Sequence, residues 1–302
     1  MLYPVNNKKR LAISLNGLWK FNFVDDAYDP GKVLENYKLV GVPSSYNDLF
    51  TTLKEREHVG YVVYEKEINF PSFNEGKWRI RLGAAAHIAK CYIDGVLVYT
   101  HNGGFLPLDF EVNSVDSLRL SILIDNRLNY QTLPIATLKE QNGNEFVDTH
   151  FDFFNYAGLH RNVFLYHVPS NPIMDINIKT KVETNATVAY SIKTNAKDVK
   201  VFCKDKYGNV VGITEGKTGS ITIDNPILWD IGKGYLYQLC VETDNDYYEE
   251  AFGIRTVEVI GKDILLNGKK VYLKGFGMHE DHITVGRGSF SALNVRDFNL
   301  LK

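Results

Sequence analysis

Short segments in which apolar and polar residues alternate run through most of the chain, and they restrict its fold more than any other feature. Residues 18–23 (LWKFNF) and 78–82 (WRIRL) are examples, and Asp94-Gly95 separates two further segments within 89–99. Alternation with a period of two is typical of half-buried β-strands, and Asp-Gly favours a two-residue hairpin because both positions need positive φ. Amphipathic segments of helical length are scarce. The sequence therefore predicts a mainly β fold of antiparallel sandwiches that begins with a jelly roll.

Two breaks divide this β-patterned sequence. Residues 169–172 (PSNP) place two prolines within four residues, which stiffens a connection and prevents sheet pairing. The segment that follows has the number and spacing of short strand patterns that an immunoglobulin-like sandwich needs. A second break falls near 257–261. We therefore predict a jelly-roll domain at 1–170, an immunoglobulin-like β-sandwich at 171–258 and the beginning of a third domain at 259–302.

The third segment changes its pattern from strand to helix. An Asn-Gly pair favours a hairpin within 264–274, the strand that completes it leads into a loop, and helical spacing begins after Ser291, which we expect to cap the helix. A strand, a loop and a helix in this order form one unit of a (β/α)₈ (TIM) barrel, whose active sites lie at the rim where strands end. The loop contains His279, Glu280 and Asp281, so we predict that these three residues line a site.

Two other interpretations of this loop stay open. Runs of charged residues often form solvated surface, and the loop is rich in charge. His279 and His282 are three residues apart, a spacing that also suits metal ligands. Neither an H-E-x-x-H helix nor a cysteine cluster accompanies them, so we expect no metal site here.

The charge balance and the cysteine count limit the partners and the compartment. The chain has 34 basic and 36 acidic residues, so it lacks the excess of positive charge that binds nucleic acid. No window approaches the ~20 apolar residues that span a membrane, and the N-terminal segment lacks the features of a secretory signal. Three widely spaced cysteines favour a reducing compartment over a disulfide framework. We expect a cytoplasmic protein that binds neither nucleic acid nor membrane.

A second candidate site lies in an aromatic run. Asp152 belongs to FDFFNYAG at 151–158, in which four rings and a glycine surround the carboxylate. Such a group could recognise a sugar, with rings against its C–H faces and the carboxylate on its hydroxyls. Alternatively, the carboxylate accepts backbone N–H groups and holds the loop in shape. Local sequence does not decide between the two roles.

Several long motifs together resemble the bacterial β-glucuronidases of glycoside hydrolase family 2. They are LNGLWKF at 15–21, VPSSYND at 42–48, FDFFNYAGLHR at 151–161 and LLNGKKVYLKGFGMHED at 265–281. The resemblance runs nearly end to end. It implies a jelly-roll sugar-binding-like domain, an immunoglobulin-like β-sandwich and the first βα unit of a truncated TIM barrel, in agreement with the strand pattern.

The resemblance also implies a function and a division of roles. The family cleaves β-D-glucuronides with retention, using two glutamates on later barrel strands beyond Lys302, so no catalytic residue is expected in this chain and we predict that it is inactive alone. Asp152 is implied to contact the sugar, and His279, Glu280 and Asp281 match the first barrel loop. No cofactor is implied. A β-galactosidase-type specificity and a non-catalytic carbohydrate-binding or assembly module are the alternatives.

Two further expectations concern partners and order. In the complete protein we expect a glucuronide or related glycoside as substrate, and a homo-oligomer as the assembly. One barrel strand and one helix cannot close a barrel. We therefore expect residues from about 275 onward to be poorly ordered or held by a second copy.

Overall fold

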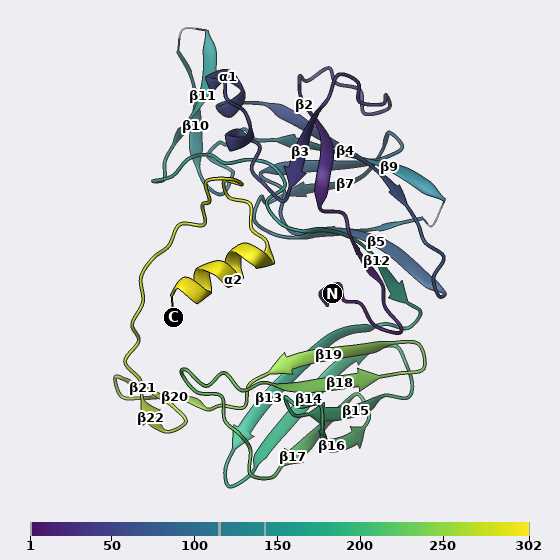
Figure 1. The fold of residues 1–302 in the computed structure, drawn as a ribbon, viewed down its shortest axis with the longest axis vertical. Helices are drawn as coiled ribbons and strands as arrows, with labels where there is room; N and C mark the ends of the chain where they lie inside the picture. The colour runs from purple at the N-terminus through teal and green to yellow at the C-terminus, as the bar shows by residue number, and fades with distance from the viewer. Residues whose placement is uncertain (1, 114–115, 142, 302) are drawn as a thin grey trace. The chain divides into compact units, whose positions relative to one another are not determined.

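The computed structural model describes residues 2–113, 116–141 and 143–301, which form two compact units (Figure 1). The jelly-roll unit comprises Ala12–Phe73, Lys77–Tyr166 and Met278–Lys302, and the second unit comprises Met1–Leu11, Asn74–Gly76 and His167–Gly277. Antiparallel strands make up most of each unit, as the alternation predicted. No helix in the described part of the chain has the length and apolar character that crossing a membrane requires.

The jelly-roll unit has two main sheets and a separate hairpin. The strand order is β3-β2-β4-β9-β6-β7 in the larger sheet and β1-β12-β5-β8 in the smaller one, and β10 pairs with β11. The strands are β1 (Ala12–Ser14), β2 (Gly17–Val24), β3 (Lys38–Val42), β4 (Tyr61–Asn69), β5 (Gly76–Leu82), β6 (Ile88–Ile93), β7 (Val96–Asn102), β8 (Leu108–Val112), β9 (Ser117–Asp125), β10 (Ala136–Gln141), β11 (Asn144–Thr149) and β12 (Val163–Pro169). Two short helical turns, η1 (Asn47–Leu49) and α1 (Leu53–Arg56), separate β3 from β4.

The core of this unit follows directly from the period-two pattern. Trp19 and Phe21 on β2 are buried, whereas Leu18, the residue before Trp19 on the same strand, is exposed. On β5, Ile80 and Leu82 are fully buried in the same way. Side chains from alternate positions thus fill the space between two packed sheets, which is how a β-sandwich forms its core.

The second unit contains a sandwich of a three-stranded and a four-stranded sheet. Their orders are β13-β14-β17 and β16-β15-β18-β19. The burial of β14 alternates residue by residue along its whole length, as expected for a strand with one face on the core. The bounds are β13 (Ile173–Val182), β14 (Ala186–Thr194), β15 (Lys200–Lys204), β16 (Val210–Glu215), β17 (Thr218–Ile223), β18 (Tyr237–Glu242) and β19 (Tyr247–Phe252).

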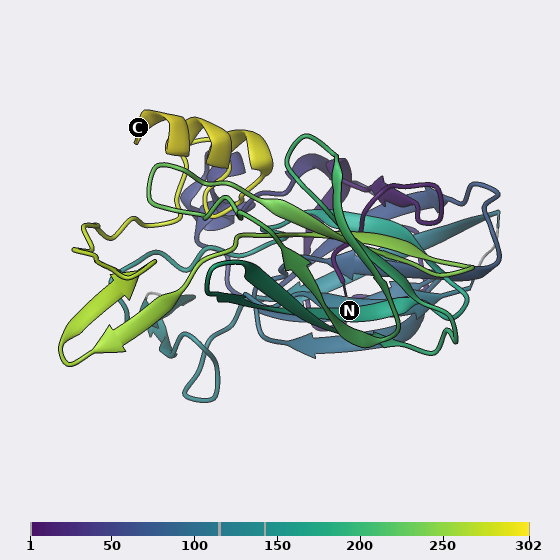
Figure 2. The ribbon, with the colours of Figure 1, turned by 90° about the horizontal axis from the view of Figure 1, so that it is seen from below.

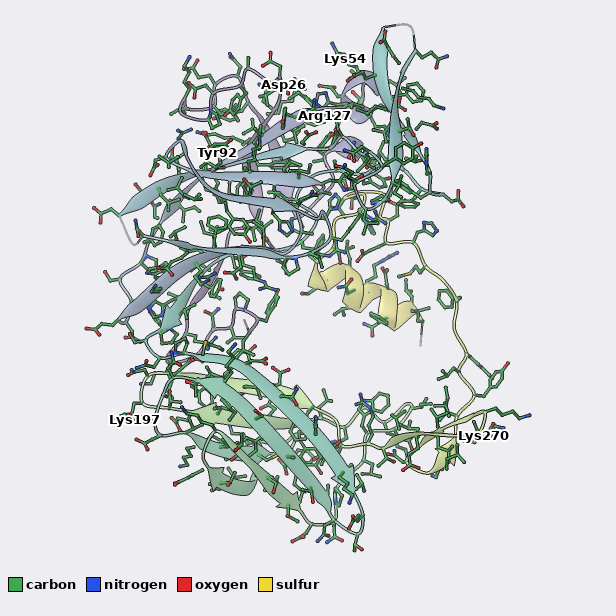
Figure 3. All side chains as sticks on the ribbon, turned by 180° about the vertical axis from the view of Figure 1, so that it is seen from behind. Asp26, Lys54, Tyr92, Arg127, Lys197 and Lys270 are labelled. Atoms are coloured by element: carbon green, nitrogen blue, oxygen red, sulfur yellow. The ribbon has the colours of Figure 1, made fainter. Side chains whose placement is uncertain are left out.

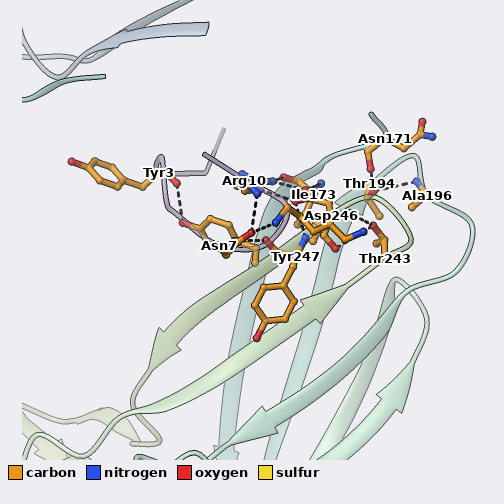
Figure 4. A network of polar contacts seen from close by, with 12 residues as sticks. Tyr3, Asn7, Arg10, Asn171, Ile173, Thr194, Ala196, Thr243, Asp246 and Tyr247 are labelled. Atoms are coloured by element: carbon orange, nitrogen blue, oxygen red, sulfur yellow. Dashed lines mark hydrogen bonds and ion pairs between the residues drawn. The ribbon is translucent and has the colours of Figure 1, made fainter. Parts of the chain in front are cut away.

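The N-terminal arm, residues 2–11, is fastened to this sandwich by a buried ion pair (Figure 4). Arg10 Nε and Nη2 donate to the two carboxylate oxygens of Asp246 at 2.8 and 2.6 Å, and the side chains are 4% and 0% exposed. Arg10 Nη2 also donates to the Ile173 carbonyl, and its guanidinium lies 5.0 Å from the ring centre of Tyr248. The arm is therefore part of the sandwich's packing.

The segment after the sandwich forms a small sheet, β20 (Val257–Ile260), β21 (Asp263–Leu266) and β22 (Lys269–Lys270), which extends away from the sandwich (Figure 2). The predicted Asn267-Gly268 hairpin is present, with φ of 51° and 73°. The predicted strand to 274 is too long, since β22 ends at Lys270.

Helix α2 (Ser291–Leu300) lies in the jelly-roll unit. The expected cap at Ser291 is wrong, because Phe290 occupies the N-cap position without a side-chain bond and Ser291 is the first helical residue.

Candidate functional site

The loop 151–161 is held against the jelly roll by close backbone approach. Gly158 has φ of 126°, and a Cβ at this position would lie 2.6 Å from the Tyr64 hydroxyl and 3.0 Å from the Ser44 carbonyl. The backbones of Gly158 and Ala86 exchange hydrogen bonds in an isolated antiparallel bridge. Only glycine accommodates both this space and this backbone conformation without strain.

Partly buried polar contacts hold the residues that follow Asp152. Asn155 Oδ1 lies 2.9 Å from His87 Nε2, and Asn155 Nδ2 donates to the Asn126 carbonyl. The Tyr156 hydroxyl donates to Asp48 Oδ2 at 2.7 Å. Burial, and then the Asp48 carboxylate, raise the pKa of Tyr156, so this hydroxyl keeps its proton and acts as a donor.

The Asp152 side chain does not hold loop 151–161 in shape through hydrogen bonds of its own. Its side chain is exposed, and it forms neither a hydrogen bond nor an ion pair with any residue that the structure describes. The backbone contact of the loop at this point is from Phe153 N to the Phe151 carbonyl. An ionised carboxylate without a protein partner has its acceptor sites available.

A pocket of about 240 Å³ opens beside this loop within the jelly-roll unit. Phe153 and Phe154 line it together with Phe146 on β11 and Arg56 at the end of α1. The Arg56 guanidinium lies 4.3 Å from the ring centre of Phe154. The pocket thus combines aromatic surface with one cationic group.

Residues 285–289 dock on the same unit through backbone hydrogen bonds. Ser45 N donates to the Val285 carbonyl, and Ser289 N donates to the His160 carbonyl, both at 2.9 Å. Arg287 N donates to Ser45 Oγ at 3.0 Å. These contacts join the segment to Ser45 and to loop 151–161. The expectation that residues from about 275 onward are poorly ordered or held by a second copy stays a prediction.

Ser45 and His160 form a buried pair at the centre of this docking. Ser45 Oγ lies 3.0 Å from His160 Nε2, and the two residues are 0% and 1% exposed. Burial, aided by the positive charges of Arg161 and Arg287, lowers the pKa of His160 to about 3, so the imidazole is neutral. A serine beside a neutral histidine resembles a nucleophile and its base. Because no ligand can reach it, the pair has a structural role.

The structure brings the predicted loop residues together with loop 151–161. The His279 ring lies 4.6 Å from the ring of Phe153, and Glu280 forms an ion pair with Arg161 Nη2. Asp281 is close enough to Tyr156 to contribute to the raised pKa of that hydroxyl. Asp152, next to Phe153, therefore lies in the loop that His279, Glu280 and Asp281 approach.

Motif reading assigned no role to several residues that build this cluster. Arg161 donates to the carbonyls of His160 and Arg287 at 3.0 Å, and the Arg287 guanidinium lies 4.9 and 5.3 Å from the ring centres of Phe105 and Phe153. Ser45 and Arg161 lie within the motifs at 42–48 and 151–161, so their place in these motifs was a signal that could have identified them. Arg287 lies outside these motifs, and no sequence signal marked it. Among the described residues, no group of three or more His, Cys, Asp or Glu side chains is placed to hold a metal ion.

Family models match almost the whole chain in three consecutive parts. The sugar binding domain of glycosyl hydrolases family 2 matches residues 12–169, a second family 2 domain matches 163–255, and the family's TIM barrel domain matches 257–302.

Similar proteins share one activity in their names. A β-glucuronidase of Streptococcus agalactiae is 37% identical over all of this chain and 53% of its own length, and one of Paenibacillus borealis is 36% identical over 55% of its length. A solved structure of Ruminococcus gnavus β-glucuronidase in complex with N1-substituted uronic isofagomine matches 99% of this chain and 56% of its own, with a TM-score of 0.94 and 36% identity. The chain spans about half the length of these relatives.

Proposed function

Because the chain belongs to glycosyl hydrolase family 2, we propose that it is the N-terminal part of a retaining hydrolase that cleaves β-D-glucuronides. The observation that carries the proposal is the exposed Asp152 carboxylate on the aromatic loop 151–161, beside the segment with His279, Glu280 and Asp281. The names of the similar proteins, and the uronic isofagomine bound by the Ruminococcus gnavus enzyme, support a glucuronide as substrate.

The proposed roles follow from what each side chain contacts. Asp152 accepts hydrogen bonds from sugar hydroxyls, because an ionised carboxylate without a protein partner has its acceptor sites available. Glu280 is already neutralised by Arg161, so it positions the loop at the rim. The pocket beside Phe153 and Phe154 gives the sugar or its leaving group an aromatic surface.

The 302-residue chain alone is expected not to turn over 4-nitrophenyl β-D-glucuronide, because a retaining mechanism needs two carboxyl groups about 5–5.5 Å apart and the resemblance assigns both to later barrel strands. The complete protein is expected to hydrolyse it. Release of 4-nitrophenol, measured for both proteins side by side, checks this. Turnover by the pure chain would refute its inactivity. If neither protein hydrolysed the glucuronide but the complete protein hydrolysed the corresponding galactoside, the substrate would be a β-galactoside instead.

Changing Asp152 to Asn in the complete protein is expected to lower kcat/KM for the glucuronide by about 10- to 100-fold, the usual value of a hydrogen bond to a charged group. Asp148→Asn is the matched control, since its carboxylate forms a surface ion pair with Lys139. That control is expected to leave kcat/KM nearly unchanged. If the two variants changed kcat/KM equally, Asp152 would not contact the substrate.

A further inference from the structure

A second pocket lies in the jelly-roll unit and shares no lining residue with the cluster described above. Its volume is about 300 Å³, and it lies between the start of β6, the loop after β9 and the start of β10. Arg127, whose position Figure 3 labels, and Tyr130 line it. This volume is at the lower end of those that bind small molecules.

The polar wall of this pocket is the Arg127 guanidinium with its bidentate partner Asp125, and Asp26 lies 3.5 Å from Arg127 Nη2. Arg127 Nε and Nη2 donate to the two oxygens of Asp125 at 2.8 and 2.7 Å, and the guanidinium lies 4.7 Å from the ring centre of Tyr61. These contacts hold the fork in place. Nη1 forms no hydrogen bond with the described residues, so its two N–H groups are available to a ligand.

An exposed aromatic ring also lines the pocket. Tyr130 is 71% exposed, although it lines the pocket. Its ring is edge-on to His150 at 5.7 Å, and His150 Nε2 lies 2.8 Å from the Thr137 hydroxyl. Thr137 also lines the pocket, so the ring is oriented by a neighbour that is itself hydrogen-bonded.

We propose that this pocket binds a neutral pyranose, as a carbohydrate site separate from Asp152. Aromatic rings such as Tyr130 pack on the C–H face of a sugar. The Nη1 N–H groups of Arg127, which the contacts with Asp125 leave available, donate to a sugar hydroxyl. The carboxylates of Asp125 and of the exposed Asp26, which lies 3.5 Å from Arg127 Nη2, more than offset the charge of Arg127, which favours a neutral ligand over an anionic one.

The test uses the 302-residue chain with cellobiose as the probe, and binding is followed by saturation-transfer NMR and titration calorimetry. Tyr130→Ala is expected to weaken binding about three- to tenfold, whereas Tyr130→Phe, which keeps the ring, retains most of it. Tyr207→Ala removes an equally exposed tyrosine, 74% in solvent, from the other unit and is expected to change nothing. Asp152→Asn is likewise expected to leave cellobiose binding intact.

Three results would overturn the proposal: no cellobiose binding to the unaltered chain, equal affinities of unaltered chain and Tyr130→Ala, or equal losses in Tyr130→Ala and Tyr207→Ala. Loss of binding in Asp152→Asn with Tyr130→Ala unaffected would locate the sugar at loop 151–161 instead. That outcome would support the proposed function of loop 151–161 and would refute the proposal of a second carbohydrate site. Glucuronide hydrolysis by the complete protein is independent of either result.

Discussion

Replacing Arg10 with alanine is expected to lower the free energy of unfolding of the immunoglobulin-like sandwich by about 3–5 kcal/mol, the usual cost of breaking a buried ion pair by removing one partner. The Asp246 carboxylate is fully buried and would keep the backbone N–H groups of Ile173 and Tyr247 as donors. Its negative charge would then remain uncompensated. Urea unfolding, followed by hydrogen exchange in peptides from β18 and β19, measures the loss in this unit alone.

The same arm supplies the control. Lys8 forms an ion pair with Glu242 at 2.7 Å, but its side chain is 63% exposed, so Lys8→Ala is expected to cost less than about 1 kcal/mol. The double variant Arg10→Ala with Asp246→Ala should be less destabilised than the sum of the two single changes, because no lone buried charge remains. If the Arg10→Ala and Lys8→Ala variants had similar free energies of unfolding, the buried ion pair would not hold the arm to the sandwich.

Local sequence predicted the hairpins well, because the backbone conformation of each turn depends on only its two central residues. Asp94 and Gly95 adopt φ of 50° and 86° and join β6 to β7, as their sequence indicated. Asn267 and Gly268 behave in the same way. The alternating burial of the strands was equally readable, since it follows from which face meets the core.

Local signals failed where a contact joins distant parts of the chain. Ser45 and His160 are 115 positions apart, and Arg287 N reaches Ser45 across 242 positions. Nothing near Ser45 marks it as the acceptor for a segment so remote. The predicted strand to residue 274 failed for a related reason. Val271 N still donates to the Ile264 carbonyl of β21, but a strand requires a neighbour in a ladder, and no described strand pairs with 272–274.

The candidate site was only partly visible for the same reason. Asp152, His279, Glu280 and Asp281 stand out as polar residues in recognisable motifs. Whether such a carboxylate is free or engaged depends on tertiary contacts: Asp152 is exposed without a protein partner, whereas Glu280 is paired with Arg161. Motifs therefore identified the residue types, and packing decided their state.

Acid is expected to release the segment 285–289 from the jelly roll as the pH falls from 6.5 toward 3. The pKa of His160 is lowered from 6.5 to about 3 in the folded protein, so between these values the unfolded state binds the additional proton. The stability that a neutral His160 confers is complete above pH 6.5 and decreases by about 1.4 kcal/mol per pH unit below it. Its neighbours His87, Arg161 and Arg287 all disfavour the charged form, and the Ser45 hydroxyl adds no compensating negative charge.

Hydrogen exchange of a peptide covering 285–289, measured from neutral pH to roughly pH 4 and corrected for intrinsic exchange, follows this release. His160→Gln is expected to weaken docking at neutral pH but to flatten its pH dependence by about one proton, because glutamine does not titrate. Burial also lowers the pKa of His87, so a smaller acid response remains in that variant. His150→Gln removes an exposed histidine and should leave the response unchanged. If the unaltered protein and His160→Gln lost protection with the same pH slope, docking would not depend on a neutral His160.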